Sequence, residues 1–147
     1  MEKWYWEENE EMVMSKDAKN KIEKEALFLE KLGYVKTDDE YSVHYTLNNI
    51  SIQVDFLRNS EESDVFIRYL DTNQVFSVGW IALVRNNLKG EKGRTENAIE
   101  LVRYVKRYYS LITNLRYCMD SNMLIDEYVR QHHFQFEKSV AEFLEKA

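Results

Sequence analysis

Residues 41–56 read YSVHYTLNNISIQVDF, two runs of alternating apolar and polar side chains that meet at Asn48-Asn49. Alternation with a period of two is typical of a β-strand that buries one face. Asparagine tolerates the positive φ that a tight hairpin turn requires, so the pair predicts the turn. The stretch therefore predicts an antiparallel hairpin, with strands at 41–47 and 50–56 whose apolar side chains share one face.

Segments on both sides extend this hairpin into a larger sheet with a helix before it. A polar loop at 58–63 separates the hairpin from expected strands at 64–70 and 74–78, which complete a four-stranded antiparallel meander with one buried face. Upstream, apolar residues at spacings of three and four predict a helix over residues 18–32, which ends at Gly33.

The C-terminal half is expected to be helical. We predict a short helix over 81–88, a long helix from Thr95, a break and new cap at residues 120–121, and a last helix to the C-terminus. The predicted fold is α+β: an N-terminal helix, a four-stranded antiparallel meander, then three helices packed on one face of the sheet. We expect a single domain over 1–147, in which residues 1–16 are a docked arm or a flexible tail.

Composition narrows the class of protein. The 147 residues include no proline, four glycines and one cysteine, with 44% apolar and 14% aromatic side chains. This composition excludes disorder of the whole chain and Pro-rich or Gly-rich linkers. One cysteine forms no internal disulfide, and no apolar run approaches the ~18 residues of a membrane span. We therefore expect a cytoplasmic protein with no membrane partner.

Charge is distributed unevenly along the chain, whose formal net charge is −6. Residues 1–62 carry 15 acidic and 8 basic side chains, whereas residues 63–147 carry 11 and 12. An acidic half disfavours nucleic acid and favours a basic protein partner. Basic side chains in residues 85–116 are interleaved with tyrosines, as in single-strand binders, but two of these tyrosines fall on an apolar helix stripe and predict core positions.

No motif predicts catalysis, a cofactor or a metal. A glycine-rich phosphate loop, a Cys-x-x-Cys pair and a His-Glu-x-x-His helix are all missing from the sequence. His132 and His133 diverge by about 100° on a helix and cannot jointly hold one metal ion. The lone Cys118 is expected to be a small buried side chain. We predict no catalytic, cofactor-binding or metal-binding residues.

Candidate partner-binding residues are carboxylates of the sheet half together with two aromatic side chains. Acidic side chains steer a basic partner, and aromatic side chains provide anchoring contact area. For Trp80, a buried position at the corner between sheet and helix is the alternative. The candidates are Asp38, Asp39, Glu40, Tyr41, Asp55, Glu61, Glu62, Asp71 and Trp80.

Three features together define a recognisable pattern: FLEKLGY at 28–34, an aromatic hairpin with an Asn-rich turn, and FSVGWI at 76–81 ahead of a helical half. The pattern resembles the small, acidic, cytoplasmic immunity-type proteins of bacterial polymorphic toxin systems, over about residues 17–115. The resemblance implies a protein that binds and blocks a cognate toxin domain without catalysis. It assigns no role to any numbered residue.

The leading hypothesis is a non-catalytic binding protein, namely an immunity protein that neutralises a cognate bacterial toxin by occluding it. Two alternatives stay open. One is a small-ligand-binding domain or enzyme with a pocket between sheet and helices, using Tyr45, His44 or Cys118. The other is a structural homo-oligomer joined through the apolar face of residues 96–146. The oligomeric state itself is open.

Overall fold

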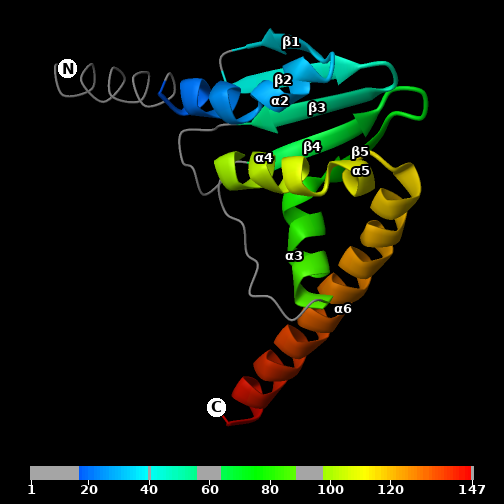
Figure 1. Cartoon of the computed structure of the whole chain (residues 1–147). Helices are drawn as coiled ribbons and strands as arrows, with labels where there is room; N and C mark the ends of the chain where they lie inside the picture. Colours follow the sequence, from blue (N-terminus) through cyan, green and yellow to red (C-terminus); the bar gives the residue numbers. More distant parts are fainter. Residues whose placement is uncertain (1–16, 40, 56–63, 89–97, 147) are drawn as a thin grey trace, which may run out of the picture.

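The structure, a computed structural model, describes residues 17–39, 41–55, 64–88 and 98–146 (Figure 1). The arm expected at residues 1–16 lies outside the described residues. Residues 17–25 are helical and lead into α2 (Leu27–Lys31). The strands are β1 (Val35–Asp38), β2 (Ser42–Leu47), β3 (Ile50–Asp55), β4 (Asp64–Tyr69) and β5 (Gln74–Ser77). The later helices are α3 (Val78–Leu88), α4 (Ala98–Arg107), α5 (Tyr109–Ile112) and α6 (Leu115–Lys146).

The strands form one antiparallel sheet in the order β1-β2-β3-β4-β5. The predicted hairpin is confirmed as β2 and β3, in which Val43 lies opposite Val54 and Tyr45 opposite Ile52. Asn48 has a φ of 52°, in the left-handed region that asparagine adopts more readily than most side chains. The α+β class and the antiparallel meander are therefore correct.

Strand β1 corrects the predicted number of strands from four to five. All four of its residues are exposed, so it lacks the alternation that identifies the other strands. Asp38 forms an ion pair with Lys19, and the Lys36 ammonium lies 3.5 Å from the Glu23 carboxylate. Both partners belong to the helix of residues 17–25. An edge strand that carries charges paired in this way gives no apolar pattern from which it could be predicted.

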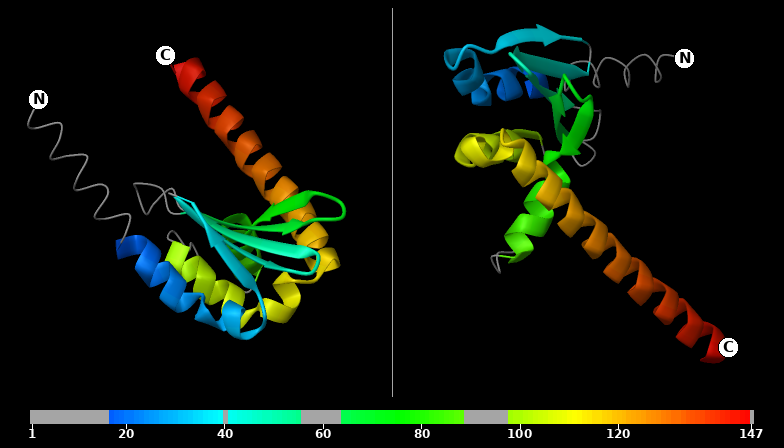
Figure 2. Two further views of the ribbon diagram at one scale, coloured as in Figure 1. Left: turned by 90° about the horizontal axis from the view of Figure 1, so that it is seen from above. Right: turned by 90° about the vertical axis from the view of Figure 1, so that its right-hand side faces the viewer.

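One face of the sheet is buried against the helices (Figure 2). The apolar residues of four strands alternate onto it, as the sequence predicted. They share one core cluster with apolar residues of all described helical segments. The buried strand residues are Val43, Tyr45, Ile52, Val54, Val65, Ile67, Tyr69 and Phe76. The buried helix residues include Ile22, Ala26, Leu29, Ile81, Ala82, Leu101, Val102, Ile112 and Cys118.

The helix boundaries of the C-terminal half differ from those predicted. The chain leaves helical geometry at Tyr108 and again at residues 113–114, and α6 then runs unbroken through residues 120–121. The predicted break is wrong because the Ser121 hydroxyl donates to the Tyr117 carbonyl within the helix and accepts a hydrogen bond from Arg85. Asn114 caps α6 instead, since its Oδ1 accepts from the Tyr117 backbone N–H.

Helix α6 is anchored to α3 over its first turns and then extends away from the sheet (Figure 1). The guanidinium of Arg85 lies 4.2 Å from the Tyr117 ring centroid and also donates to the Tyr117 carbonyl and the Ser121 hydroxyl. The 32 residues of α6 span roughly 48 Å. Neither α6 nor any other helix in the described part of the chain has an apolar stretch long enough to cross a membrane.

The start of α3 is held by a carboxylate from a different strand. Asp64 on β4 accepts hydrogen bonds from the Ser77 hydroxyl at 2.6 Å and from the Gly79 N–H at 3.0 Å. Ser77 in turn accepts from the Trp80 N–H, as an N-cap residue does. This cap explains why α3 begins at Val78, directly after β5, rather than at residue 81 as predicted.

We expect Gly79→Ala to destabilise the protein. A Cβ at this position would lie 2.9 Å from Asp64 Oδ1, so the cap has to move. Overpacking of this kind costs roughly 1–3 kcal/mol of unfolding free energy, measurable by urea denaturation.

An Asp64→Ala background supplies the control for this prediction. The clash is absent there, and alanine is the better helix former by about 1 kcal/mol, so Gly79→Ala should become neutral or stabilising. An equal loss of unfolding free energy in both backgrounds would show that the cap does not explain the glycine.

Tyr45 brings a phenol hydroxyl into the core. Its side chain is fully buried, and its hydroxyl oxygen has no hydrogen-bond partner among the described residues. Desolvation raises the pKa of this phenol above its ordinary value. Tyr34 differs, because its hydroxyl lies 2.7 Å from the Tyr109 hydroxyl and shares a hydrogen bond with it.

Tyr45→Phe should therefore not destabilise the fold. It removes a buried polar atom whose desolvation no bond offsets, so we expect the unfolding free energy to rise by about 1 kcal/mol. Tyr34→Phe is the matched control and should lower it by about 1 kcal/mol, because it removes a bond that is made. A Tyr45→Phe loss as large as the Tyr34→Phe loss would contradict this account.

Candidate functional site

The face of the sheet opposite the core carries the candidate site. Residues directly opposite in antiparallel register share a face, so the pairings assign each strand residue to one side. The helix of residues 17–25, α2 and α4 lie on the core side (Figure 2). We call the other side the outer face. Its residues are Val35, Thr37, Ser42, His44, Thr46, Ser51, Gln53, Asp55, Asp64, Phe66, Arg68, Val75 and Ser77.

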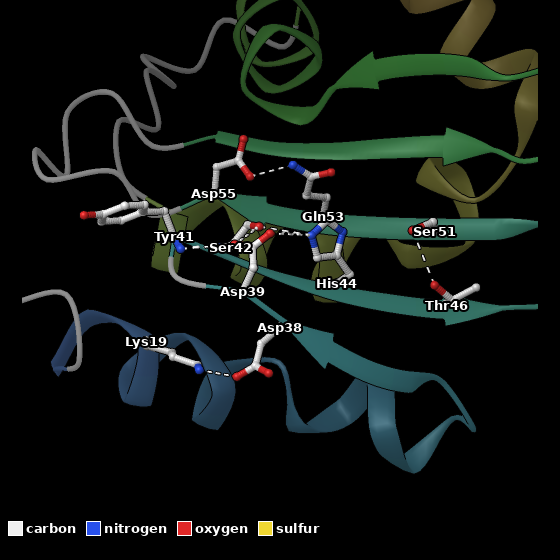
Figure 3. Close-up of polar contacts among 10 residues, drawn as sticks. All are labelled: Lys19, Asp38, Asp39, Tyr41, Ser42, His44, Thr46, Ser51, Gln53 and Asp55. Atoms are coloured by element: carbon white, nitrogen blue, oxygen red, sulfur yellow. Dashed lines mark hydrogen bonds and ion pairs between the residues drawn. The ribbon is translucent and has the colours of Figure 1, made fainter.

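Asp39 is held in a fixed position between β1 and β2 (Figure 3). Its Oδ1 accepts from the Tyr41 N–H at 3.1 Å, the Ser42 N–H at 2.9 Å and the Ser42 hydroxyl at 2.7 Å. Its Oδ2 lies 3.6 Å from His44 Nε2. The hydrogen bond from the Ser42 hydroxyl, followed by that from the Tyr41 N–H, lowers the pKa of the carboxyl below its ordinary 3.8. The side chain is 64% exposed, so an ionised group is presented to solvent in one orientation.

The order of groups in this network differs from that of a nucleophilic triad. The Ser42 hydroxyl donates its hydrogen bond to Asp39. Towards His44 Nε2, which lies 3.0 Å away, the hydroxyl oxygen is therefore the acceptor. In a Ser-His-Asp triad the histidine stands between serine and aspartate and takes the serine proton. Ser42 is also 6% exposed. The arrangement stabilises a turn and orients a carboxylate.

Two further predicted residues lie at the same end of the sheet (Figure 3). Asp38 is the last residue of β1, and the hydrogen bond from Lys19 lowers the pKa of its carboxyl. Asp55 is the last residue of β3 and accepts a hydrogen bond from the Gln53 amide at 2.7 Å. We call Asp38, Asp39 and Asp55 the acidic end. Tyr41, also predicted, is half-buried beside it.

The structure does not bring Asp71 to the acidic end. Asp71 lies in the β4–β5 turn, where its N–H donates to the Asn49 side chain and its carboxylate accepts from the Asn49 amide. This reciprocal pair joins two turns at the opposite end of the sheet. Glu40, Glu61 and Glu62, which were also predicted, lie outside the described residues.

Trp80 also lies apart, on α3. It is 43% exposed rather than buried at the corner, and its ring packs edge-on against Tyr128 of α6 at 6.2 Å. Tyr128 stacks on His132, with ring centroids 3.9 Å apart. The six predicted residues that the structure describes therefore do not form one surface. Four of them, the acidic end and Tyr41, lie at one end of the sheet, whereas Asp71 and Trp80 lie elsewhere.

A hollow that the sequence did not predict occupies the middle of the outer face. Its volume is about 200 Å³, and it is open to solvent. The strand alternation that places its members on the solvent side could have indicated it, because Phe66 and Val75 are large apolar residues where polar ones are expected. Its lining residues are His44, Ser51, Gln53, Phe66, Arg68, Leu70 and Val75.

The three residues of the ligand-pocket alternative do not converge. Tyr45 lies on the core face, whereas His44 lies on the outer face. Cys118 is buried on α6, where its thiol donates to the Ile112 carbonyl and burial raises its pKa to about 11. A thiol with a raised pKa is a poor nucleophile, and this one packs as a small core side chain.

The histidines and the basic, tyrosine-containing segment of the sequence have structural contacts of their own. Within the described ranges, no three His, Cys, Asp or Glu side chains lie close enough to hold a metal ion. His132 Nδ1 lies 2.9 Å from the Tyr128 carbonyl. In the basic segment, Tyr104 is only 9% exposed. The Arg103 guanidinium donates a hydrogen bond to the Glu25 carboxylate at 2.7 Å. A buried ring is not available to stack on bases.

Comparison of the chain with protein-family models, curated proteins and solved structures finds no match.

The hydrogen bonds to Asp39 predict a pH dependence of stability. A carboxyl whose pKa is lower in the folded state stabilises the fold above its unfolded pKa, and this contribution is lost as the pH falls. We expect Asp39→Asn to unfold at lower urea concentration than the original protein at pH 6. The difference should shrink as the pH falls from about 4 through the lowered pKa, because a protonated Asp39 resembles asparagine.

Ser42→Ala checks the cause of this shift, since the Ser42 hydroxyl is the largest contributor. In an NMR titration of the Asp39 carboxyl carbon, the pKa should rise toward 3.8 in this variant. An unchanged pKa would show that other groups hold the carboxylate ionised.

Proposed function

We propose that this chain is a non-catalytic binding protein that uses the outer face and acidic end of its sheet to occlude a basic protein partner in the cytoplasm. The observation that carries the proposal is a pair of fixed carboxylates, Asp39 and Asp55, at one end of a sheet face that no described helix covers. Asp38 lies at the same end but on the helix side of the sheet, opposite Val43 in register. An open sheet face offers a broad contact surface, and fixed charges at its rim orient an approaching partner.

The acidic end is suited to this task because its charges are preorganised. Asp39 is held by two backbone N–H groups and a hydroxyl, and Asp55 by the Gln53 amide. Side chains that are already ordered lose less conformational entropy on binding than mobile ones. Half-buried Tyr41 beside Asp39 supplies aromatic contact area.

The kind of partner follows from the resemblance to immunity-type proteins. Such a protein would bind a toxin domain, and a toxin that acts on nucleic acid carries the basic surface that an acidic end complements. We therefore propose that the partner is a basic toxin domain of the same bacterium, encoded next to this chain. Occlusion of that domain requires no catalytic residue in this one.

Neutralising the acidic end should slow association with the partner. For Asp38→Asn/Asp39→Asn/Asp55→Asn we expect the association rate constant with the adjacent gene product to fall about tenfold at low salt, with a flatter dependence on ionic strength. Stopped-flow fluorescence measures the rate, and rescue of growth on co-expression with the toxin measures neutralisation.

The matched control changes the net charge equally at another place. Asp120→Asn/Asp126→Asn/Glu127→Gln removes three exposed carboxylates of α6 and should alter the rate little. Equal slowing by both variants would show that net charge, not the acidic end, steers binding. An adjacent gene product that neither arrests growth nor binds this chain would overturn the immunity proposal.

A further inference from the structure

Arg68 is unusual among the outer-face residues. It is the only arginine or lysine among the described sheet residues on that face, and its side chain is exposed. No hydrogen bond or ion pair joins its guanidinium to any described residue. The charged groups that the register places on the same face are the carboxylates of Asp55 and Asp64, four residues or roughly 13 Å away along the strands.

The surroundings of Arg68 combine apolar contact with a hydrogen-bond donor. Leu70 is 46% and Val75 44% exposed, and both line the hollow together with Phe66. Ser51 lies opposite Arg68 in register, and among the described residues its hydroxyl makes one long contact, accepting from the Thr46 hydroxyl at 3.4 Å. The Ser51 hydroxyl hydrogen is thus available beside the guanidinium.

The hollow is too small for a cofactor but large enough for one amino-acid residue. Its volume of about 200 Å³ is below the roughly 300–1,000 Å³ of typical small-molecule sites. An occupant that uses the whole lining needs an apolar body against Phe66, Leu70 and Val75 and an anionic group on Arg68. A chain-terminal apolar residue has both, whereas a glutamate side chain offers only two methylenes.

We propose that this hollow binds the C-terminal residue of a protein partner, with its free carboxylate on the Arg68 guanidinium and its apolar side chain against Phe66, Leu70 and Val75. Arginine matches a carboxylate with two parallel hydrogen bonds, and capture of a chain terminus is a recurring mode of peptide recognition. Gln53 turns its amide nitrogen to Asp55, so its amide oxygen can accept the backbone N–H of that terminal residue. The identity of the occupant as a protein rests on the proposed function, but the chemistry of the hollow does not.

The test uses small probes and the full chain. N-acetyl-L-phenylalanine carries the free carboxylate, its primary amide lacks it, and N-acetyl-L-glutamic acid amide places a carboxylate on a side chain. In ¹H–¹⁵N NMR titrations we expect the free acid to shift amides of residues 51, 53, 68 and 75, with a Kd on the order of 1 mM. The phenylalanine amide and the glutamate probe should each bind about fivefold more weakly.

Variants assign the effect to Arg68. Arg68→Gln should remove the preference for the free acid, whereas Arg103→Gln, on α4 and paired with Glu25, should retain it. Any of four results would overturn the inference: no shifts at 20-fold above the expected Kd, shifts confined to other elements, equal affinity for acid and amide, or preference for the glutamate probe. Because no partner protein enters this experiment, its failure is distinguishable from failure of the proposed function.

Discussion

The two-residue period of the β2–β3 hairpin determines which residues lie on each face of the sheet. Val43, Tyr45, Ile52 and Val54 occupy one face and are buried, so the residues between them must occupy the other. A shift of one residue in register would exchange the two sets and expose the core. Because the helices pack their apolar residues against one face, the residues of the outer face are determined as well. Ser42, Gln53 and Asp55 are among them.

The fixed outer face allows its polar groups to act in more than one way. Asp64 caps α3 through Ser77 and Gly79 and so directs the helical half away from the sheet edge. Asp39 is fixed by backbone N–H groups, which move less than the long side chain that binds Asp38. Exposed ion pairs such as Lys19–Asp38 contribute little to stability. Their presence at the rim is better explained by the need to keep an edge strand soluble.

Much of the fold could be predicted from the sequence because alternation and helical spacing report burial directly. The hairpin, β4, β5 and the apolar stripes of the helices carry that signal. Strand β1 does not carry that signal, because its residues are all exposed and its charged side chains pair with the helix of residues 17–25. The continuity of α6 at Ser121 depends on Arg85, 36 residues earlier, which no local pattern reports.

The candidate site was harder to predict than the fold for a related reason. The sequence offered the carboxylates of the sheet half together as candidates, but Asp71 and Asp55 lie at opposite ends of the sheet because successive strands run in opposite directions. No sequence pattern marks Arg68 as a candidate. Its environment is formed by Ser51 and Val75, its neighbours on the flanking strands β3 and β5.

The separation of charges on the outer face bears on specificity. A partner that contacted only Asp39 and Asp55 could bind in several orientations, because two carboxylates attract any basic patch. Under the two proposals, a second contact of opposite sign at Arg68, roughly 13 Å along the strands from Asp55, would restrict the partner to one orientation. A basic surface placed over Arg68 is repelled, so the same residue disfavours the wrong pose as well as stabilising the right one. Opposite charges at fixed separation on one sheet would thus select the proposed partner by geometry as well as by net charge.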